Sequence, residues 1–243
     1  MNVEELIIET FKKAVKMMVE NPNPELRKNS NSDFHSLKII YPCYRQKEDK
    51  TKIRISEQEI KQLFIQTLIK DQNDFYFSVE TPTKNRYSDF TSNEPKVYRN
   101  EMSGRSACLD LCLYDKNFNR KHLIEFKAKN PDEKDIKKDF LKLFTEEGKQ
   151  KESHNYFIHI LDSADDNTIK SIKEKYYNSW DYCTKQKIKA QNNITVYLFI
   201  QKSSKCYKIE LGHDCPKSSD DIVFIDYTEK LHEKTDSDSS GPV

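Results

Sequence analysis

The sequence predicts a mixed α/β fold in which a central mixed sheet is flanked by helices. Three observations predict it. Several segments place apolar residues at helical spacing, which indicates amphipathic helices. Short apolar runs lie between them, and the run 156–161 is apolar almost throughout, as expected of a central strand buried on both faces. From Ser56 to Leu161 the predicted order is helix, three strands, helix and strand (α-β-β-β-α-β).

Length and composition favour one sizeable domain with short extensions. The chain has 243 residues, and 33% of them are charged. Its 13 Phe and 13 Tyr residues are enough for a real core despite a mean hydropathy of −0.90. The net charge of +1 gives no global basic field, so a nucleic-acid surface would need local clusters of lysine.

The first third of the chain predicts two helices. Apolar residues at helical spacing indicate a helix over residues 3–20, which ends before two prolines, and a short strand follows at 37–41. A second helix begins at Ser56, where Ser56 and Glu59 have the spacing of a capping box, and runs to about Lys70.

The middle of the chain predicts strands. A strand at 75–80 is expected to stop near Pro82, and a polar loop then covers 83–104. Two apolar runs follow, 107–114 and 122–128, joined by a turn.

The remaining elements complete the sheet and its cover. We expect a helix at 132–147, a strand at 156–161, a helix at 168–189, and strands at 195–200, 206–210 and 222–225. The predicted organisation is an N-terminal helical extension (1–50), a core (51–165), a C-terminal helix and strands packed on the core (166–230), and a disordered tail (231–243).

Asp110, Glu125 and Lys127 carry the most informative pattern, because each lies in one of two apolar strand-like runs. A buried charge is costly unless it has a partner or a metal. Successive strand residues point to opposite faces, so Glu125 and Lys127 share a face, and a hairpin brings Asp110 to them. Two carboxylates and an ammonium on one patch suit a hard divalent cation and an activated water.

This pattern, together with the order of elements around it, resembles the PD-(D/E)-x-K nucleases with the restriction-endonuclease-like fold. Leu109 stands where the family usually has proline. The resemblance implies a metal-dependent nuclease that hydrolyses phosphodiester bonds, most simply a DNA endonuclease of restriction or phage-defence type. It implies Mg²⁺, with Mn²⁺ able to substitute, held by Asp110, Glu125 and the backbone carbonyl of Phe126, with Lys127 orienting the attacking water.

Relatives often add a glutamate from the first core helix to the metal shell. Glu57 and Glu59 compete for this part. Glu57 lies about 50° from the centre of the apolar face and Glu59 about 110°. We therefore expect Glu57 to be the ligand, while a favourable charge in the first helical turn remains its alternative explanation.

Other residues have weaker signals. Arg105 and Lys129 are candidates to contact the substrate phosphate, or are ordinary solvated side chains. Lys142 is a further candidate, although lysines 134, 137, 138 and 142 also read as the polar face of a helix. The histidines 154 and 159 receive no role, and the aromatic residues 176, 177 and 180 are expected in the core rather than stacked on bases.

Two other classes of protein remain open. The same fold can serve as a non-catalytic module that binds nucleic acid or protein within a larger complex. A zinc-stabilised protein built on Cys183, Cys206, His213 and Cys215 is the third hypothesis, although their spacing is not a standard one.

No run reaches the roughly 18 apolar residues of a membrane span. We therefore expect a cytoplasmic protein that binds DNA, with a homodimer or a defence-system protein as further partners.

Overall fold

The structure is a computed structural model that describes residues 3–20, 56–70, 75–88, 94–98, 104–146, 155–186, 192–212 and 216–229. The chain divides into two compact units, Met1–Asn73 and Asp74–Val243. The predicted strand at 37–41 and the predicted disordered tail lie outside the described residues.

The first unit contains two helices that pack against each other, α1 (Val3–Glu20) and α2 (Glu57–Lys70). Both were predicted from apolar spacing, and both predictions are confirmed. The buried face of α1 comprises Leu6, Ile7, Phe11, Ala14 and Val15. α2 begins where predicted, because the Ser56 carbonyl accepts the first backbone hydrogen bonds of the helix, from the N–H groups of residues 59 and 60.

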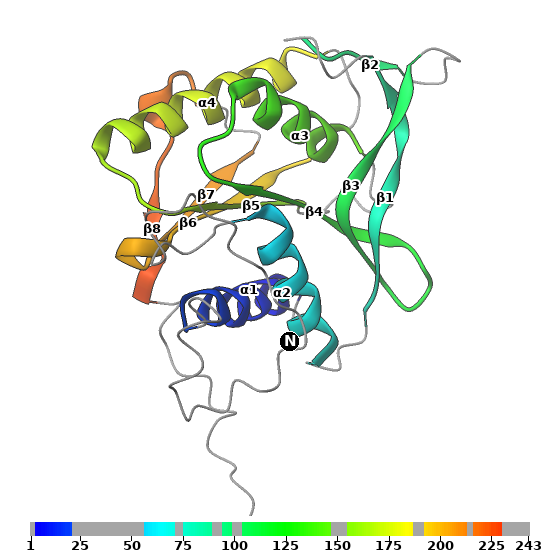
Figure 1. The fold of residues 1–243 in the computed structure, drawn as a ribbon. Helices are drawn as coiled ribbons and strands as arrows, with labels where there is room; N and C mark the ends of the chain where they lie inside the picture. Colours follow the sequence, from blue (N-terminus) through cyan, green and yellow to red (C-terminus); the bar gives the residue numbers. More distant parts are fainter. Residues whose placement is uncertain are drawn as a thin grey trace, which may run out of the picture. The chain divides into compact units, whose positions relative to one another are not determined.

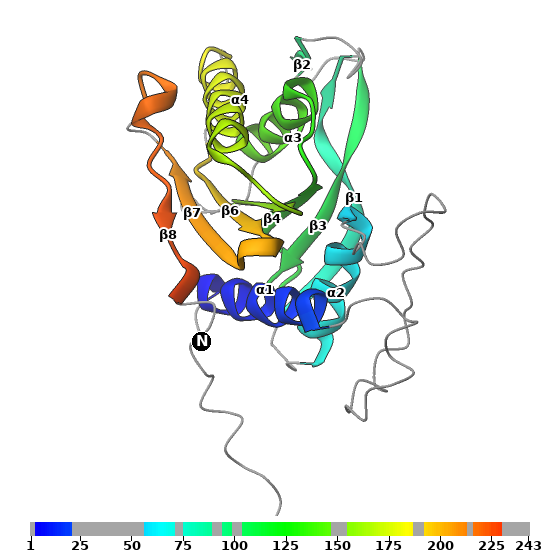
Figure 2. The same cartoon turned by 60° about the vertical axis from the view of Figure 1, so that its left-hand side comes forward.

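The second unit is built on one eight-stranded sheet with the order β2-β1-β3-β4-β5-β6-β7-β8 (Figures 1 and 2). Its strands are β1 (Tyr76–Tyr87), β2 (Val97–Tyr98), β3 (Arg105–Tyr114), β4 (Arg120–Ala128), β5 (Asn155–Leu161), β6 (Ile194–Ile200), β7 (Lys205–Leu211) and β8 (Ile225–Asp226). β4, β5 and β6 are parallel to one another, and the other neighbours pair antiparallel. The predicted mixed α/β class with a mixed sheet is therefore confirmed.

Two helices, α3 (Glu133–Thr145) and α4 (Asp166–Thr184), lie side by side over one face of this sheet (Figures 1 and 2). Together with the sheet they enclose a core that includes Phe140, Phe144, Phe157 and Trp180. β5 and β6 are buried along their whole length, which explains their nearly continuous apolar sequence.

The largest difference from the predicted elements concerns β1. The strand does not stop at Pro82 but continues to Tyr87, and the expected loop also contains β2. β2 pairs with β1 only opposite Arg86 and Tyr87, so Pro82 lies where no N–H is required on that side of the strand. The register of β1 against β3 shifts between Pro82 and Arg86.

Smaller differences concern element ends. α4 begins at Asp166 rather than 168, because the Asp165 side chain caps it by accepting a hydrogen bond of 2.7 Å from the Thr168 N–H. β8 lies at the end of the predicted 222–225 strand. Among the helices of the described residues, none combines the length and the apolarity that a membrane crossing requires.

Candidate active site

Asp110 lies on β3 and contacts the neighbouring strand β4 through its side chain. β3 and β4 form the predicted antiparallel hairpin, and the ladder position next to Asp110 is Leu111, opposite Ile124. The Asp110 Oδ2 then accepts a hydrogen bond of 2.9 Å from the backbone N–H of Phe126. The aspartate is thus held next to the segment that carries Glu125.

The Glu125 side chain is buried beneath α3, with 2% of the residue exposed. Side chains alternate along β4, so Glu125 and Lys127 share the face that this helix covers. The Nζ atom of Lys142, on α3, lies 2.5 Å from Glu125 Oε1. A lysine of the helix therefore covers the glutamate of the motif.

A second carboxylate, Asp139 of α3, joins two lysines. Its Oδ2 lies 2.7 Å from Lys127 Nζ, and its Oδ1 lies 3.0 Å from Lys142 Nζ. Lys142 also donates a hydrogen bond of 2.9 Å to the Cys108 carbonyl on β3. We call Glu125, Lys127, Asp139 and Lys142 the ion network.

Burial and neighbouring charges shift the pKa values of the ion network in different directions. Burial raises the pKa of the Glu125 carboxyl, which Lys142 opposes and which the charges of Asp139 and Asp110 reinforce. Burial also acts to raise the pKa of Asp139, but the ammonium groups of Lys142 and Lys127 outweigh it and hold that pKa below its usual value. Burial acts to lower the pKa of Lys142, but Asp139 and Glu125 raise it, so Lys142 stays protonated.

Access to the ion network differs between its two sides. The Lys127 side chain is 14% exposed and Asp110 is partly exposed, whereas the side chains of Glu125 and Lys142 are 3% and 4% exposed. A substrate or water can therefore approach the Asp110–Lys127 side. Glu125 is buried, and the Lys142 ammonium lies against its Oε1 atom.

The oxygen atoms present fit a hard divalent cation in chemical type. Carboxylates and backbone carbonyls are the ligands that Mg²⁺ and Ca²⁺ prefer. Within the described parts of the chain, no group of three or more His, Cys, Asp or Glu side chains is arranged around a common metal position. The position among Glu125, Asp139 and the Cys108 carbonyl is filled by the Lys142 ammonium.

Glu57 and Glu59 lie on α2, within the first compact unit, and both are partly exposed. The other predicted site residues lie in the second unit. Completion of the metal site by Glu57, or by Glu59, therefore stays a prediction, as does a metal contact of the Phe126 carbonyl.

The two candidate phosphate contacts lie at strand ends. Arg105 is the first residue of β3 and is exposed, opposite Tyr87 of β1. Lys129, also exposed, directly follows β4 and has a φ of 67°, in the left-handed region. Contact of either side chain with phosphate stays a prediction.

A buried histidine, His159, contacts the turn at Lys129, although the sequence analysis assigns it no role. The His159 Nε2 lies 2.6 Å from the Lys129 carbonyl, and its Nδ1 lies 2.6 Å from the Tyr176 hydroxyl. A carbonyl only accepts, so Nε2 carries the hydrogen and Nδ1 accepts from the tyrosine. Burial lowers the pKa of His159 to about 4, so the ring is neutral at pH 7. Tyr176 and Trp180 are buried, as predicted for core residues.

Sequence reasoning missed Asp139 and misread Lys142. The interpretation of Lys142 as part of a solvated helix face is wrong, since 3% of the residue is exposed. The neighbouring residues indicate that Lys142 is buried, because it lies between two apolar pairs, 140–141 and 143–144. A lysine within such a run needs a buried partner, and Asp139 precedes it by one helical turn.

The zinc hypothesis rests on residues that the structure describes only in part. Cys183 and Cys206 are buried free thiols, and burial raises the pKa of both. His213 and Cys215 lie outside the described residues. The zinc hypothesis therefore stays untested.

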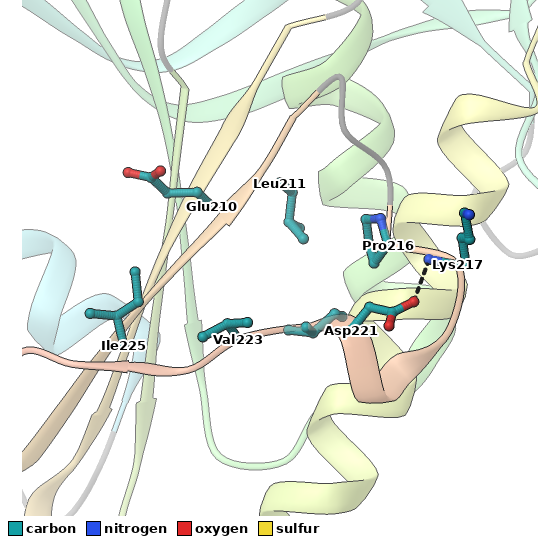
Figure 3. A pocket seen from close by; sticks show the side chains of 8 residues that line it. Glu210, Leu211, Pro216, Lys217, Asp221, Val223 and Ile225 are labelled. Carbon is teal, nitrogen blue, oxygen red and sulfur yellow. Dashed lines mark hydrogen bonds between the residues drawn. The ribbon is translucent and has the colours of Figure 1, made fainter.

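A separate pocket lies at the β7–β8 end of the sheet (Figure 3). Its volume is about 450 Å³, and it is lined by Glu210, Leu211, Pro216, Lys217, Asp221, Ile222, Val223 and Ile225. The Asp221 carboxylate accepts a hydrogen bond of 2.8 Å from the Lys217 backbone N–H, which closes the loop at its rim. β5 and β6 separate this pocket from the strands of the ion network.

Comparison with known proteins gave no match of this chain to a family model, to a curated protein or to a solved structure.

Proposed function

We propose that this protein is a metal-dependent nuclease, a DNA endonuclease of the restriction or phage-defence type. The observation that carries the proposal is the hydrogen bond from the Phe126 N–H to Asp110, which holds one carboxylate beside the strand that bears Glu125 and Lys127. The order from α2 through β1, β3, β4 and α3 to β5 also supports it, since the resemblance predicts this order, with β2 as a two-residue addition.

Asp110 and Glu125 would hold Mg²⁺, with the Phe126 carbonyl and Glu57 as further ligands. When bound, the ion would supply a Lewis acid that lowers the pKa of a water ligand and stabilises the leaving oxygen. Lys127 donates hydrogen bonds to the attacking water and to the phosphoryl oxygen that gains charge.

Asp139 contributes by positioning Lys127. Its Oδ2 lies 2.7 Å from the Lys127 ammonium, so Asp139 fixes the position of that ammonium. Asp139 therefore acts through Lys127 and need not touch the substrate.

The test is cleavage of supercoiled plasmid, linear duplex, single-stranded DNA and RNA by the wild type, Asp110→Asn and Lys127→Ala, each with Mg²⁺, Mn²⁺ or EDTA. We expect cleavage that requires the metal and falls about 10²- to 10⁴-fold in both variants. Cleavage that survives EDTA, or that both variants retain, would contradict the proposal.

A second candidate is a non-catalytic module that binds nucleic acid or protein. It is favoured by one observation: Glu125 and Lys127 already have buried partners within the chain, so the ion network needs no metal for charge balance. Absence of any Mg²⁺- or Mn²⁺-linked stabilisation would favour this candidate, since a ligand at a hundredfold its Kd adds about 2.7 kcal/mol to the free energy of unfolding.

A further inference from the structure

The Lys142 ammonium has the surroundings of a bound cation. Three oxygens surround its Nζ atom: Glu125 Oε1 at 2.5 Å, Cys108 O at 2.9 Å and Asp139 Oδ1 at 3.0 Å. They come from β4, β3 and α3, so the helix and both motif strands meet at this one charge. An ammonium has three donors, which matches the three oxygens in number.

Both carboxylates of the ion network face ammonium groups. Glu125 Oε1 lies 2.5 Å from Lys142 Nζ, and Asp139 Oδ2 lies 2.7 Å from Lys127 Nζ. Their contacts with Lys142 and Lys127 are ion pairs, which depend on charge more than on direction. A different cation of higher charge can therefore take the same oxygens.

A divalent ion and the ammonium cannot share these oxygens. The ion network now has two carboxylates facing two ammonium groups. A further cation at van der Waals distance from Lys142, with water excluded, meets strong repulsion. Release of Lys142 toward the partly exposed Asp110–Lys127 side removes that repulsion and leaves two carboxylates and a carbonyl for the incoming ion.

We propose that Glu125, Asp139 and the Cys108 carbonyl form a divalent-cation site that Lys142 fills as a built-in, displaceable cation. Metal loading is then an exchange: the ion enters as the Lys142 side chain leaves. Asp139 becomes a metal ligand as well as the residue that positions Lys127. The proposal rests on the proposed function in taking Glu125 as a metal ligand. It also explains how the carboxylates of Glu125 and Asp139 are balanced by a positive charge before the metal binds.

The test compares Mn²⁺ binding, measured by calorimetry, in the wild type, Lys142→Met and a matched control. Lys134→Met is that control, since Lys134 lies on the same helix with a side chain 47% exposed and 4.0 Å from Asp132. We expect Lys142→Met to bind Mn²⁺ at least about tenfold more tightly than the wild type, and Lys134→Met to match the wild type. In EDTA, Lys142→Met should melt at a lower temperature, and Mn²⁺ should restore it.

The site is located by a double variant. Adding Asp139→Asn to Lys142→Met should remove the gain in Mn²⁺ affinity. Equal or weaker Mn²⁺ binding by folded Lys142→Met overturns the proposal, and so does a gain that survives Asp139→Asn.

A measurement on the wild type keeps the proposal testable if Lys142→Met does not fold. Trace acetylation read by mass spectrometry reports how accessible each lysine is. Lys142 should be unreactive in EDTA and become reactive when Mn²⁺ saturates the protein, while Lys134 reacts equally in both. Saturation without a change at Lys142, or no Mn²⁺ binding at all, overturns the exchange.

Failure of this proposal is distinct from failure of the proposed function. Tighter Mn²⁺ binding by Lys142→Met without any nucleic-acid cleavage would leave the cation site standing and reject the nuclease. Metal-dependent cleavage by the wild type, with no gain of Mn²⁺ affinity in Lys142→Met, would support the nuclease and reject the exchange of Lys142 for a metal ion.

Discussion

Two buried glutamates of the second unit, Glu125 and Glu146, are held by different sets of donors. Glu146, at the end of α3, is fully buried, and its carboxylate accepts hydrogen bonds of 2.8 Å from the backbone N–H groups of Lys84 and Asn85. The Tyr87 hydroxyl adds a third, at 3.1 Å. Glu125, by contrast, faces the ammonium of a flexible side chain.

The contrast separates a carboxylate held by backbone donors from one paired with the ammonium of a lysine. Backbone donors are fixed by the fold, so Glu146 fastens α3 to the irregular part of β1 where the register shifts. The ammonium that faces Glu125 belongs to the Lys142 side chain, whose position no backbone hydrogen bond of the helix fixes. Arg120 also pairs with Glu146, at 3.5 Å, so the two backbone donors, rather than the depth of burial, distinguish Glu146 from Glu125.

The largest expected effect is on cleavage by a matched pair of variants. Glu125→Gln should lower the rate about 10²-fold or more, because a neutral amide does not replace a carboxylate as a ligand of a divalent cation. Glu146→Gln should retain the wild-type rate at a temperature where it is folded. The measurement is plasmid cleavage with Mg²⁺, and equal losses in both variants would erase the distinction.

The next effect is on stability and concerns the histidine that, like Glu146, has fixed partners. His159 has a folded pKa of about 4, below its usual 6.5, so the unfolded chain binds the extra proton between these values. Its contribution is therefore present above pH 6.5 and is lost as pH falls toward 4, by up to about 3 kcal/mol.

Urea unfolding of the wild type and His159→Gln at pH 7, 5.5 and 4.5 measures this contribution. The wild type should lose stability more steeply with falling pH than the variant does. Parallel slopes would show that His159 is not held neutral.

The smallest expected effect is the stability cost of Glu146→Gln, about 2 kcal/mol, because a neutral amide accepts only one of the two bidentate backbone bonds. The free energy of unfolding in urea measures it, and Mn²⁺ should leave the cost unchanged. A metal-dependent recovery of Glu146→Gln would show that this carboxylate behaves like Glu125 and would contradict the difference between the two.

Local patterns in the sequence predict the elements with strong periodicity and the candidate site residues that lie close together along the chain. The helices α1 and α2, the hairpin of β3 and β4, and the buried strand β5 follow from local patterns of apolar residues, which act over a few residues. The proximity of Asp110 to Glu125 follows from the same hairpin, since strand alternation and a short turn leave few other arrangements.

The partners of Glu125 and Lys127 follow from the packing of α3 on the sheet and not from local sequence. Their partners, Asp139 and Lys142, lie on a helix whose rotation over the sheet depends on the packing of the whole core, so no local pattern assigns them. The continuation of β1 past Pro82 is a similar case, because it depends on how short its neighbour β2 is. A charge in an apolar run indicates that the charge has a buried partner, but only the packed fold shows which residue that partner is.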